Sequence, residues 1–352
     1  MQGPGIQPRG ATVLVGAVLI ALLGLGVTVA PVPYVVLQPG PTVDTLGERD
    51  GVPVIEIEGE GLAADGTAGE NVGELRLTTV SVRPDISVLD AVWAWFDDEE
   101  AVVPAELVYP PGQSRQEVEE RNTEQFTRSQ SAAEAAAMRH LGYPVRVSVA
   151  DVAAGGPAAG VLAPGDIITA VDGTEVNQTE DLTRLVSERP VGTTLEVEYE
   201  RDGEPATAKL TTAPDPEDAN VSRIGVVITA EVDHPYELTI ELDRIGGPSA
   251  GLMFALGIID KIDPEDLTGG RIIAGTGSIT ADGEVGPIGG VPQKLVAARA
   301  AGATAFLVPA ANCPEAVANA PDGLILIEVE TLTDALDGLA ALRAGEEPET
   351  CD

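Results

Sequence analysis

The longest apolar run lies near the start of the chain. Residues 11–30 are 20 uncharged and mostly apolar positions, which as a helix would cross about 30 Å of hydrocarbon. Arg9 precedes this run, and the first charge after it is Asp44. The positive-inside rule then places the N-terminus in the cytoplasm and the rest outside. A cleaved signal peptide is the alternative, because Thr28 and Ala30 have a suitable spacing for cleavage.

We favour an uncleaved anchor over residues 1–33. It predicts a single-pass protein of the cytoplasmic membrane that contacts the membrane through its N-terminal helix. The bulk of the chain would then lie on the extracytoplasmic side.

The next segment, residues 34–142, mixes strand and helix patterns. Residues 54–57 and 73–82 read as strands, the second with the alternation of a half-buried strand. SVLDAVWAWF reads as a short amphipathic helix. A longer helix begins at Ser114, which forms a capping box with Glu117, and ends near Gly142.

Residues 143–213 have a different pattern, with short strands, one helix over 179–188 and a hairpin that turns at Asp202-Gly203. The stretch PAAGVLAPGDIITAVDGTEV resembles the PDZ domains of bacterial envelope proteases. This resemblance implies that an extended peptide adds as a strand beside residues 145–152, in a groove next to the helix. The expected peptide-binding residues are Val145, Val147 and Val149. The loop before them contains Pro144, which lacks the amide that a terminal carboxylate would need.

Composition narrows the classes of partner. The chain has 352 residues, enough for two domains or more, and a formal net charge of −37. A polyanion such as nucleic acid would be repelled. The only cysteines are Cys313 and Cys351, and no CxxC or His/Cys cluster occurs, so we expect neither a metal site nor a cofactor.

The sequence GPSAG around Ser249 matches the pattern of a hydrolase nucleophile. Both histidines, His140 and His234, precede this serine, which excludes the order of an α/β-hydrolase triad. The alternative is a serine that only caps a tightly packed helix. If Pro248 lies in the first helical turn, the free amides of that turn could stabilise an oxyanion. The flanking glycines, Gly247 and Gly251, would leave room for a substrate backbone.

A lysine that is held neutral can also activate a serine. The chain has three lysines. Lys209 lies in a strand of the PDZ-like segment, and Lys261 lies at what we expect to be the exposed end of the helix after Ser249. Lys294 follows Pro292 in an apolar stretch that predicts the first turn of a helix. Burial and the positive helix end would both lower the pKa of Lys294.

IGGPSAGLMFAL and IIAGTGSITADGEVGPIGGVPQKLVAARAAGATAFLVPAAN resemble the proteolytic domain of Lon peptidases. The resemblance implies that Ser249 is the nucleophile, Lys294 the general base, and Thr276 a hydroxyl that orients the pair. It also implies a Lon-like domain over residues 221–345, followed by an acidic tail over 346–352. Part of residues 34–142 resembles the N-terminal portion of such a domain, which would make the PDZ-like module an insertion.

The full pattern resembles the membrane-anchored, PDZ-containing Lon-family proteases of bacteria. We therefore predict an α+β chain with an N-terminal transmembrane helix, a PDZ-like β-rich module and a Lon-type proteolytic domain. None of the three lysines follows a glycine, so the chain has no P-loop and peptide cleavage would not use ATP.

The expected substrates are extracytoplasmic proteins or peptides, selected in part by the PDZ-like module. The chain could also form a homo-oligomer, and the sequence does not decide its oligomeric state. The rival interpretation is an inactive membrane scaffold that binds peptide ends through this module. The predicted location outside the cytoplasm also favours a disulfide between Cys313 and Cys351, the one pairing that two cysteines allow.

Overall fold

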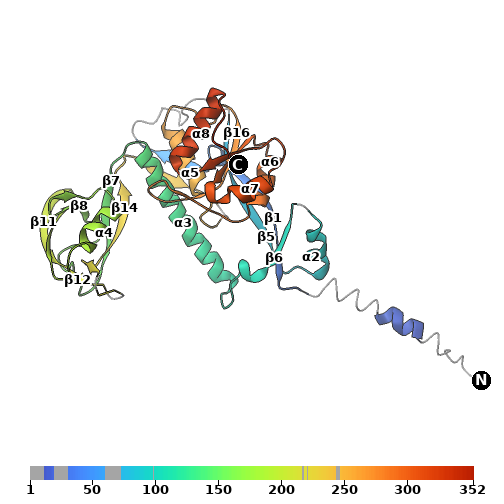
Figure 1. Cartoon of the computed structure of the whole chain (residues 1–352), viewed down its shortest axis with the longest axis horizontal. Coiled ribbons are helices and arrows are strands. Elements are labelled where there is room, and N and C mark those ends of the chain that lie inside the picture. Colours follow the sequence, from blue (N-terminus) through green and yellow to red (C-terminus); the bar gives the residue numbers. More distant parts are fainter. Residues whose placement is uncertain are drawn as a thin grey trace, which may run out of the picture.

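The computed structural model describes residues 12–19, 31–59, 73–97, 99–215, 218–219, 221–242 and 246–352. Two folded units stand apart in Figure 1. The larger contains the C-terminus, and the smaller is a β-rich unit at the far end of helix α3 (Arg115–His140).

The larger unit is built on a six-stranded sheet with the order β20-β19-β16-β5-β1-β6. Strands β5, β16, β19 and β20 run parallel, while β1 is antiparallel to β5 and β6. The strands are β1 (Tyr34–Asp44), β5 (Glu74–Arg83), β6 (Ala101–Pro104), β16 (Ile272–Gly275), β19 (Ala305–Pro309) and β20 (Ile325–Val329). Segments from before and after the β-rich unit therefore form one sheet.

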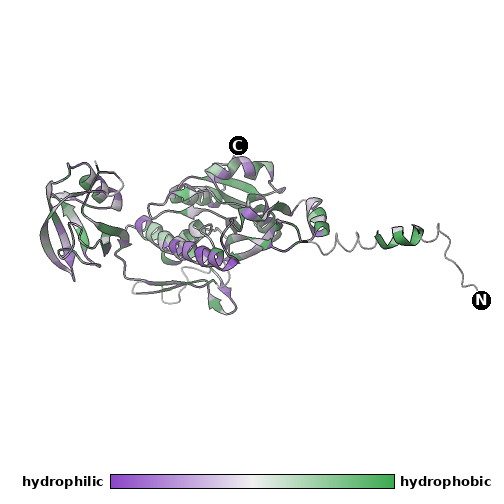
Figure 2. Ribbon diagram, turned by 90° about the horizontal axis from the view of Figure 1, so that it is seen from below, coloured by the Kyte–Doolittle hydropathy of each residue, from purple (hydrophilic) through white to green (hydrophobic). Residues whose placement is uncertain are grey.

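Helices complete this unit: α2 (Val88–Trp95), α3, α5 (Gly251–Ile262), α6 (Val291–Ala300), α7 (Cys313–Ala318) and α8 (Leu332–Ala344). Helix α5 has buried residues around its whole circumference and packs on α3, where the rings of Phe126 and Phe254 meet edge to face at 5.7 Å. Figure 2 shows that α3 is hydrophilic over its first part and more hydrophobic in a stretch before its hydrophilic last turn. The predicted capping box of Ser114 and Glu117 is present at the start of α3.

The remaining elements of the larger unit are short. Strand β4 pairs with β15, β2 with β3, and β17 with β18. They are β2 (Glu48–Arg49), β3 (Val52–Pro53), β4 (Ile55–Glu58), β15 (Glu237–Ile240), β17 (Ser278–Ile279), β18 (Val285–Gly286), and the 3-10 turns η1 (Ala105–Leu107) and η2 (Ala310–Asn312).

The β-rich unit contains a second sheet with the order β11-β10-β8-β7-β14, in which β9 pairs with β8, and one helix. Its elements are β7 (Val145–Val152), β8 (Ile167–Val171), β9 (Thr174–Glu175), α4 (Thr179–Ser187), β10 (Thr194–Arg201), β11 (Glu204–Thr211), β12 (Ala213–Pro214), β13 (Ser222–Arg223) and β14 (Val226–Val232). The turn at Asp202-Gly203 joins β10 to β11, as the hairpin pattern predicts.

Strand β14 changes the predicted peptide site. It pairs antiparallel with β7 along the whole strand, from Val226 opposite Val152 to Val232 opposite Val145. On the other side of β7, β8 pairs with Val147 and Ser148, so within the described part of the chain neither edge of β7 is free along its length. Val147 and Val149 are buried in the core of the unit, so the prediction of a peptide beside Val145, Val147 and Val149 is wrong. The sheet also continues beyond residue 213, where we expected the module to end.

The β-rich unit is inserted between elements of the larger unit. Helix α3 leads into β7, and β14 leads back to β15. The two connections meet in a polar junction, where the Tyr143 and Tyr236 hydroxyls are 2.9 Å apart and His234 Nε2 lies 3.0 Å from Glu134 Oε1.

The N-terminal region does not support the predicted anchor. Residues 12–19 are helical, but no helix in the described part of the chain is long and apolar enough to cross a bilayer. Residues 1–11 and 20–30, which include most of the predicted span, lie outside the described residues. The predicted localisation as a single-pass protein of the cytoplasmic membrane is contradicted by this finding.

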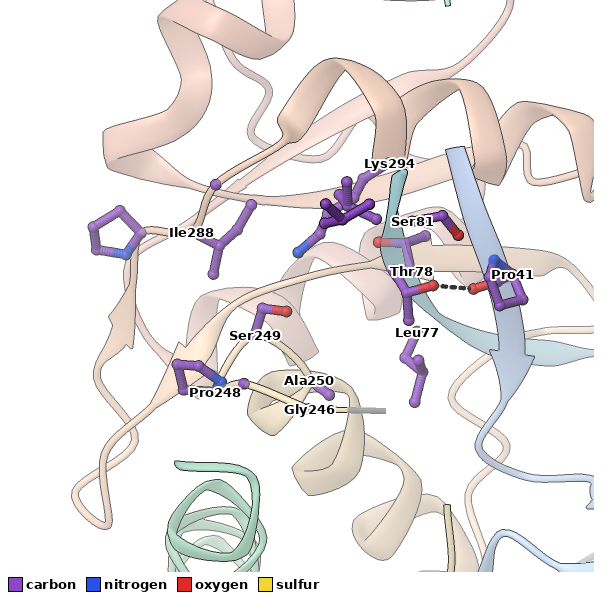
Figure 3. Close-up of a pocket in the computed structure, with 16 residues that line it drawn as sticks. Pro41, Leu77, Thr78, Ser81, Gly246, Pro248, Ser249, Ala250, Ile288 and Lys294 are labelled. Carbon is purple, nitrogen blue, oxygen red and sulfur yellow. Dashed lines mark hydrogen bonds between the residues drawn. The ribbon is translucent and has the colours of Figure 1, made fainter. Parts of the chain in front are cut away.

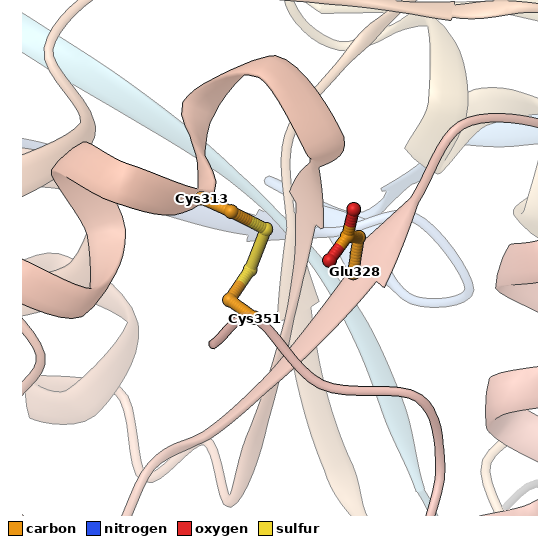
Figure 4. Close-up of side chains that lie close together, drawn as sticks. All are labelled: Cys313, Glu328 and Cys351. Atoms are coloured by element: carbon orange, nitrogen blue, oxygen red, sulfur yellow. A yellow bond between two sulfur atoms is a disulfide. The ribbon is translucent and has the colours of Figure 1, made fainter.

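The acidic C-terminal tail lies along β20. The amide of Glu328 donates to the carbonyl of Glu349, and the amide of Cys351 donates to the carbonyl of Leu326. A disulfide joins Cys351 to Cys313, with 5.2 Å between their Cα atoms. Figure 4 shows Glu328 beside this bridge. Because both sulfurs are bonded to each other, this cluster offers no thiolate to a metal.

Candidate active site

A cavity of about 910 Å³ opens beside Ser249. Three segments form its walls: residues 77–82 of β5, residues 246–250, and residues 287–289 before α6. Lys294 lines the same cavity, and Figure 3 shows its amine pointing into the cavity on the side of Ser249.

The loop that carries Ser249 rests on α3. The amide of Gly247 donates to the carbonyl of Asn122 at 3.0 Å. The Ser129 hydroxyl donates to the carbonyl of Pro248 at 3.1 Å. Neither α3 residue could be predicted from the sequence, because both lie 119 or more positions before the loop and carry no local motif.

Two glycines allow this loop its shape. Gly247 has φ of +87°, a conformation that residues with a Cβ rarely adopt. A Cβ on Gly251 would lie 2.7 Å from Ser129 Oγ and 2.8 Å from Ile279 Cγ2. Glycine is therefore required at position 247 by the backbone conformation and at position 251 by close packing.

Lys294 lies in the first turns of α6. Its amide donates to the carbonyl of Gly290, and Pro292 occupies the start of the helix as the sequence pattern predicts. The residue is 3% exposed. Burial lowers the pKa of Lys294 to about 7, since a charged ammonium loses its hydration there. A large fraction of this amine is thus neutral at physiological pH.

Thr276 connects Lys294 to the serine loop. Lys294 Nζ donates to Thr276 Oγ1 at 2.8 Å, and Thr276 Oγ1 donates to the carbonyl of Ser249 at 3.0 Å. The same carbonyl accepts from the amide of Gly277 at 2.9 Å. Thr276 is 1% exposed. It therefore fixes the lysine amine relative to the backbone of Ser249.

The backbone after Ser249 differs from the prediction in one respect. Helix α5 begins at Gly251, so Pro248 precedes the helix by three residues and does not lie in its first turn. The amide of Leu252 is occupied by the carbonyl of Gly277. Among the described residues, the amides of Ser249 and Ala250 have no acceptor and lie beside the cavity. They are the available donors for an oxyanion.

The other lysines and the histidines lie elsewhere. Lys261 is at the opposite end of α5 from Ser249, and about 15 Å along the helix axis separates it from the first residue of the helix, Gly251. It is half-buried and not exposed as predicted. This burial lowers the pKa of Lys261, while Asp44 and Asp260 act in the opposite direction. Lys209 is on the exposed face of β11, and His234 bonds Glu134 at the junction of the two units.

Two family models match the chain. The PDZ domain matches residues 116–212, and the Lon protease (S16) C-terminal proteolytic domain matches residues 244–340. The first match begins at the second residue of α3 and stops before β14. The second contains Ser249, Thr276 and Lys294.

Curated relatives match over the proteolytic part. Lon protease 2 of Bacillus subtilis is 41% identical over 95 residues, covering 26% of this chain and 16% of that protein. The archaeal Lon protease of Methanothermobacter thermautotrophicus is 32% identical over 124 residues, covering 34% of this chain and 19% of that protein. The chain thus spans less than a fifth of the length of each of these relatives.

Among solved structures, the PDZ domain of an SdrC-like protein from Listeria monocytogenes is 28% identical, with a TM-score of 0.22, over 23% of this chain and 85% of that chain. The family matches and the Lon protease relatives together assign the two units. The chain combines a PDZ domain with the C-terminal proteolytic domain of Lon proteases, which is the catalytic domain of a serine peptidase.

Proposed function

We propose that the chain is an endopeptidase in which Ser249 is the nucleophile and neutral Lys294 is the general base. The observation that carries this proposal is the buried Lys294 amine, whose pKa is about 7 and which Thr276 ties to the Ser249 backbone. A neutral amine can accept a proton from a serine hydroxyl, whereas an ammonium cannot.

The chemistry is acyl transfer through a covalent intermediate. Lys294 takes the proton of Ser249 Oγ as this oxygen bonds to a peptide carbonyl carbon, and the amides of Ser249 and Ala250 hold the oxyanion. The C–N bond then breaks, and the leaving amine takes the proton from Lys294. Water attacks the acyl-enzyme with Lys294 again as base, which releases the second product and restores the serine.

Cleavage proceeds without ATP in this proposal. The lysines support cleavage without ATP. None of the three follows a glycine, so the chain lacks the Gly-Lys-Ser/Thr ending of a P-loop. The substrates we propose are proteins and peptides in unfolded or extended form.

The PDZ domain would select among these substrates, at a different edge from the one we first predicted. Strand β14 ends the sheet order, and helix α4 packs near it. Val227 of this strand is 57% exposed. An extended peptide can add to such an edge strand, so we place the peptide beside β14.

The test is incubation of the chain with casein in the absence of nucleotide. We expect wild type to cut casein, and Ser249→Ala and Lys294→Ala to be inactive while folded. Equal cleavage by the Lys294→Ala variant would refute the lysine base. No cleavage by wild type would instead favour the rival scaffold.

A further inference from the structure

Helix α2 leaves most of its large side chains uncovered. Ala94 is its one fully buried residue. Trp93, Trp95 and Phe96 at its C-terminal end are between 69% and 78% exposed. A folded protein rarely exposes several aromatic side chains together unless they bind a partner. The outer surface of α2 is therefore a candidate interaction site.

A groove of about 410 Å³ lies between α2, β1 and β6. Every described residue that lines it is aliphatic or aromatic, among them Tyr34 of β1, Val102 of β6, and Trp95 and Phe96 of α2. The groove and the cavity beside Ser249 have no lining residue in common. Figure 1 shows α2 next to β6, the last strand in the sheet order. An apolar segment of a partner can bury its side chains in this groove.

Acidic side chains stand next to the groove in the chain. Asp97 and Glu99 closely follow Phe96, and both are exposed. Glu106 is exposed on η1, which packs on β1. The groove itself is thus apolar, while the segments beside it are negatively charged.

These charges decide between the possible partners. The arginines on either side of α2 in the sequence already pair with other carboxylates, Arg83 with Glu100 and Arg115 with Asp85. A second copy of the chain brings a formal net charge of −37 and is repelled. A segment with lysine or arginine beside its apolar residues is attracted by the carboxylates and by the faces of the aromatic rings.

The groove continues the surface of the catalytic cavity. Val82 lines that cavity and pairs with Leu37 of β1. The next residue of β1, Val36, pairs with Val102, which lines the groove. Tyr34, also in the groove, lies three residues before Leu37, about 10 Å along the strand. One substrate chain can therefore occupy both places.

We infer that the groove is an exosite, a substrate-binding surface outside the active-site cavity, and that it holds an apolar segment flanked by lysine or arginine. This inference rests on the proposed function, because the segment belongs to the protein that Ser249 cuts. It names a substrate class: proteins in which such a segment stands near an extended, cleavable one. Trp95 makes the main contact, since tryptophans that fill a pocket carry much of the binding energy of an interface.

Binding to the Ser249→Ala chain tests the chemistry of the occupant. The probe is a fluorescein-labelled peptide of alternating leucine and alanine between two pairs of lysines. One control peptide has glutamates in place of the lysines, and the other has serines in place of the leucines. By fluorescence anisotropy we expect the lysine peptide to bind at least about tenfold more tightly than either control. Equal affinities for the lysine and glutamate peptides would overturn the inference.

Two tryptophans of α2 provide a matched pair of variants. Trp95 lines the groove, whereas Trp93 does not, and both are exposed. In the Ser249→Ala background we expect Trp95→Ser to weaken binding of the lysine peptide at least about tenfold, and Trp93→Ser less than about threefold. Equal losses in the two variants would show that the peptide does not use the groove.

The acidic side chains are tested separately. Glu99→Lys combined with Glu106→Lys should weaken binding of the lysine peptide at least about threefold at low salt, with a smaller loss at high salt. The control is Glu315→Lys combined with Asp322→Lys, which makes the same change in net charge at exposed positions close to β20, at the other end of the sheet order. Equal losses in the two double variants would contradict a local role of the acidic residues.

A fusion peptide separates the exosite from the proposed function. It joins the lysine peptide, through a linker of about ten Gly-Ser residues that spans about 17 Å, to a casein peptide that wild type cuts. We expect the fusion to raise kcat/KM at least about fivefold through a lower KM, and Trp95→Ser to remove this gain without changing hydrolysis of the casein peptide alone. Cleavage with no gain would overturn the exosite and leave the serine chemistry intact. Binding that depends on Trp95, in a chain that cuts nothing, would support the groove and its cationic partner and refute the peptidase.

Two further measurements test other occupants of the groove. Cosedimentation of wild type, but not Trp95→Ser, with phosphatidylcholine vesicles and no binding of the lysine peptide would assign the groove to a lipid surface. A dimer in analytical ultracentrifugation that Trp95→Ser dissociates would assign it to a second copy of the chain. Either result would overturn the inference.

Discussion

Replacing Lys294 by methionine should make the protein inactive and also more stable. The side chain is 3% exposed, and its pKa falls from 10.5 to about 7 on folding. In the folded protein, the Lys294 amine must therefore either stay charged without its hydration or lose its proton. In the unfolded chain, the same amine keeps its proton at neutral pH. Methionine has a similar length and carries no charge, so it fits the same space without this penalty.

The size of the effect follows from linkage. One unit of pKa corresponds to about 1.4 kcal/mol. The shift from 10.5 to about 7 thus gives a full penalty of about 5 kcal/mol below pH 7 and about 4 kcal/mol at pH 7. Between pH 7 and 10.5 the unfolded state binds more protons, so the stability of wild type rises with pH relative to the variant. Above pH 10.5 the penalty is gone.

The assay is urea unfolding of wild type and Lys294→Met from pH 6 to pH 10. The repulsion among the acidic residues is nearly the same in both proteins and cancels in the difference. Lys209→Met is the matched control, because the Lys209 side chain is 74% exposed. A difference between wild type and Lys294→Met that does not shrink as pH rises would refute the buried neutral amine, and with it the proposed base.

The remaining predictions concern activity and the C-terminus. Cleavage by wild type should rise about tenfold between pH 6 and pH 8 as Lys294 loses its proton, and then level off; a rise centred above pH 9 in peptide hydrolysis would contradict this. Lys294→Arg should be inactive in the casein assay, since a guanidinium keeps its proton. Deletion of residues 143–232, which includes β14, should change the choice of protein substrates more than hydrolysis of a short peptide; equal losses would make the PDZ domain part of the catalytic unit. Cys351→Ser should lower the free energy of unfolding by about 3 to 4 kcal/mol, which is the chain-entropy value for a separation of 38 residues. Two free thiols in denatured, unreduced wild type would contradict the bridge.

Local patterns predict two of the residues that line the candidate site. Ser249 and Lys294 stand in short motifs whose glycines and prolines determine the backbone, and the lowered pKa of Lys294 follows from the apolar residues around it. The capping box at Ser114 likewise depends on residues three positions apart.

Contacts between distant segments were not predictable in this way. Both β7 and β14 alternate apolar and polar residues, and nothing in either segment shows that they pair across more than 70 positions. The support of the Ser249 loop by Asn122 and Ser129 also depends on how α3 packs on α5. Pro248 was misplaced because the chain forms a turn at Ser249 and Ala250 before α5 begins at Gly251.

The C-terminal tail covers the edge strand β20 of the central sheet. Strand β20 ends the sheet order, and its residues Leu326 and Ile327 are buried. Glu349 and Cys351 occupy its outer hydrogen-bonding groups, and the disulfide keeps them there. An uncovered edge of this kind is a template for pairing with other chains. We expect reduction of the bridge to release the tail and expose this edge, so that the reduced protein associates with itself more readily than the oxidised one.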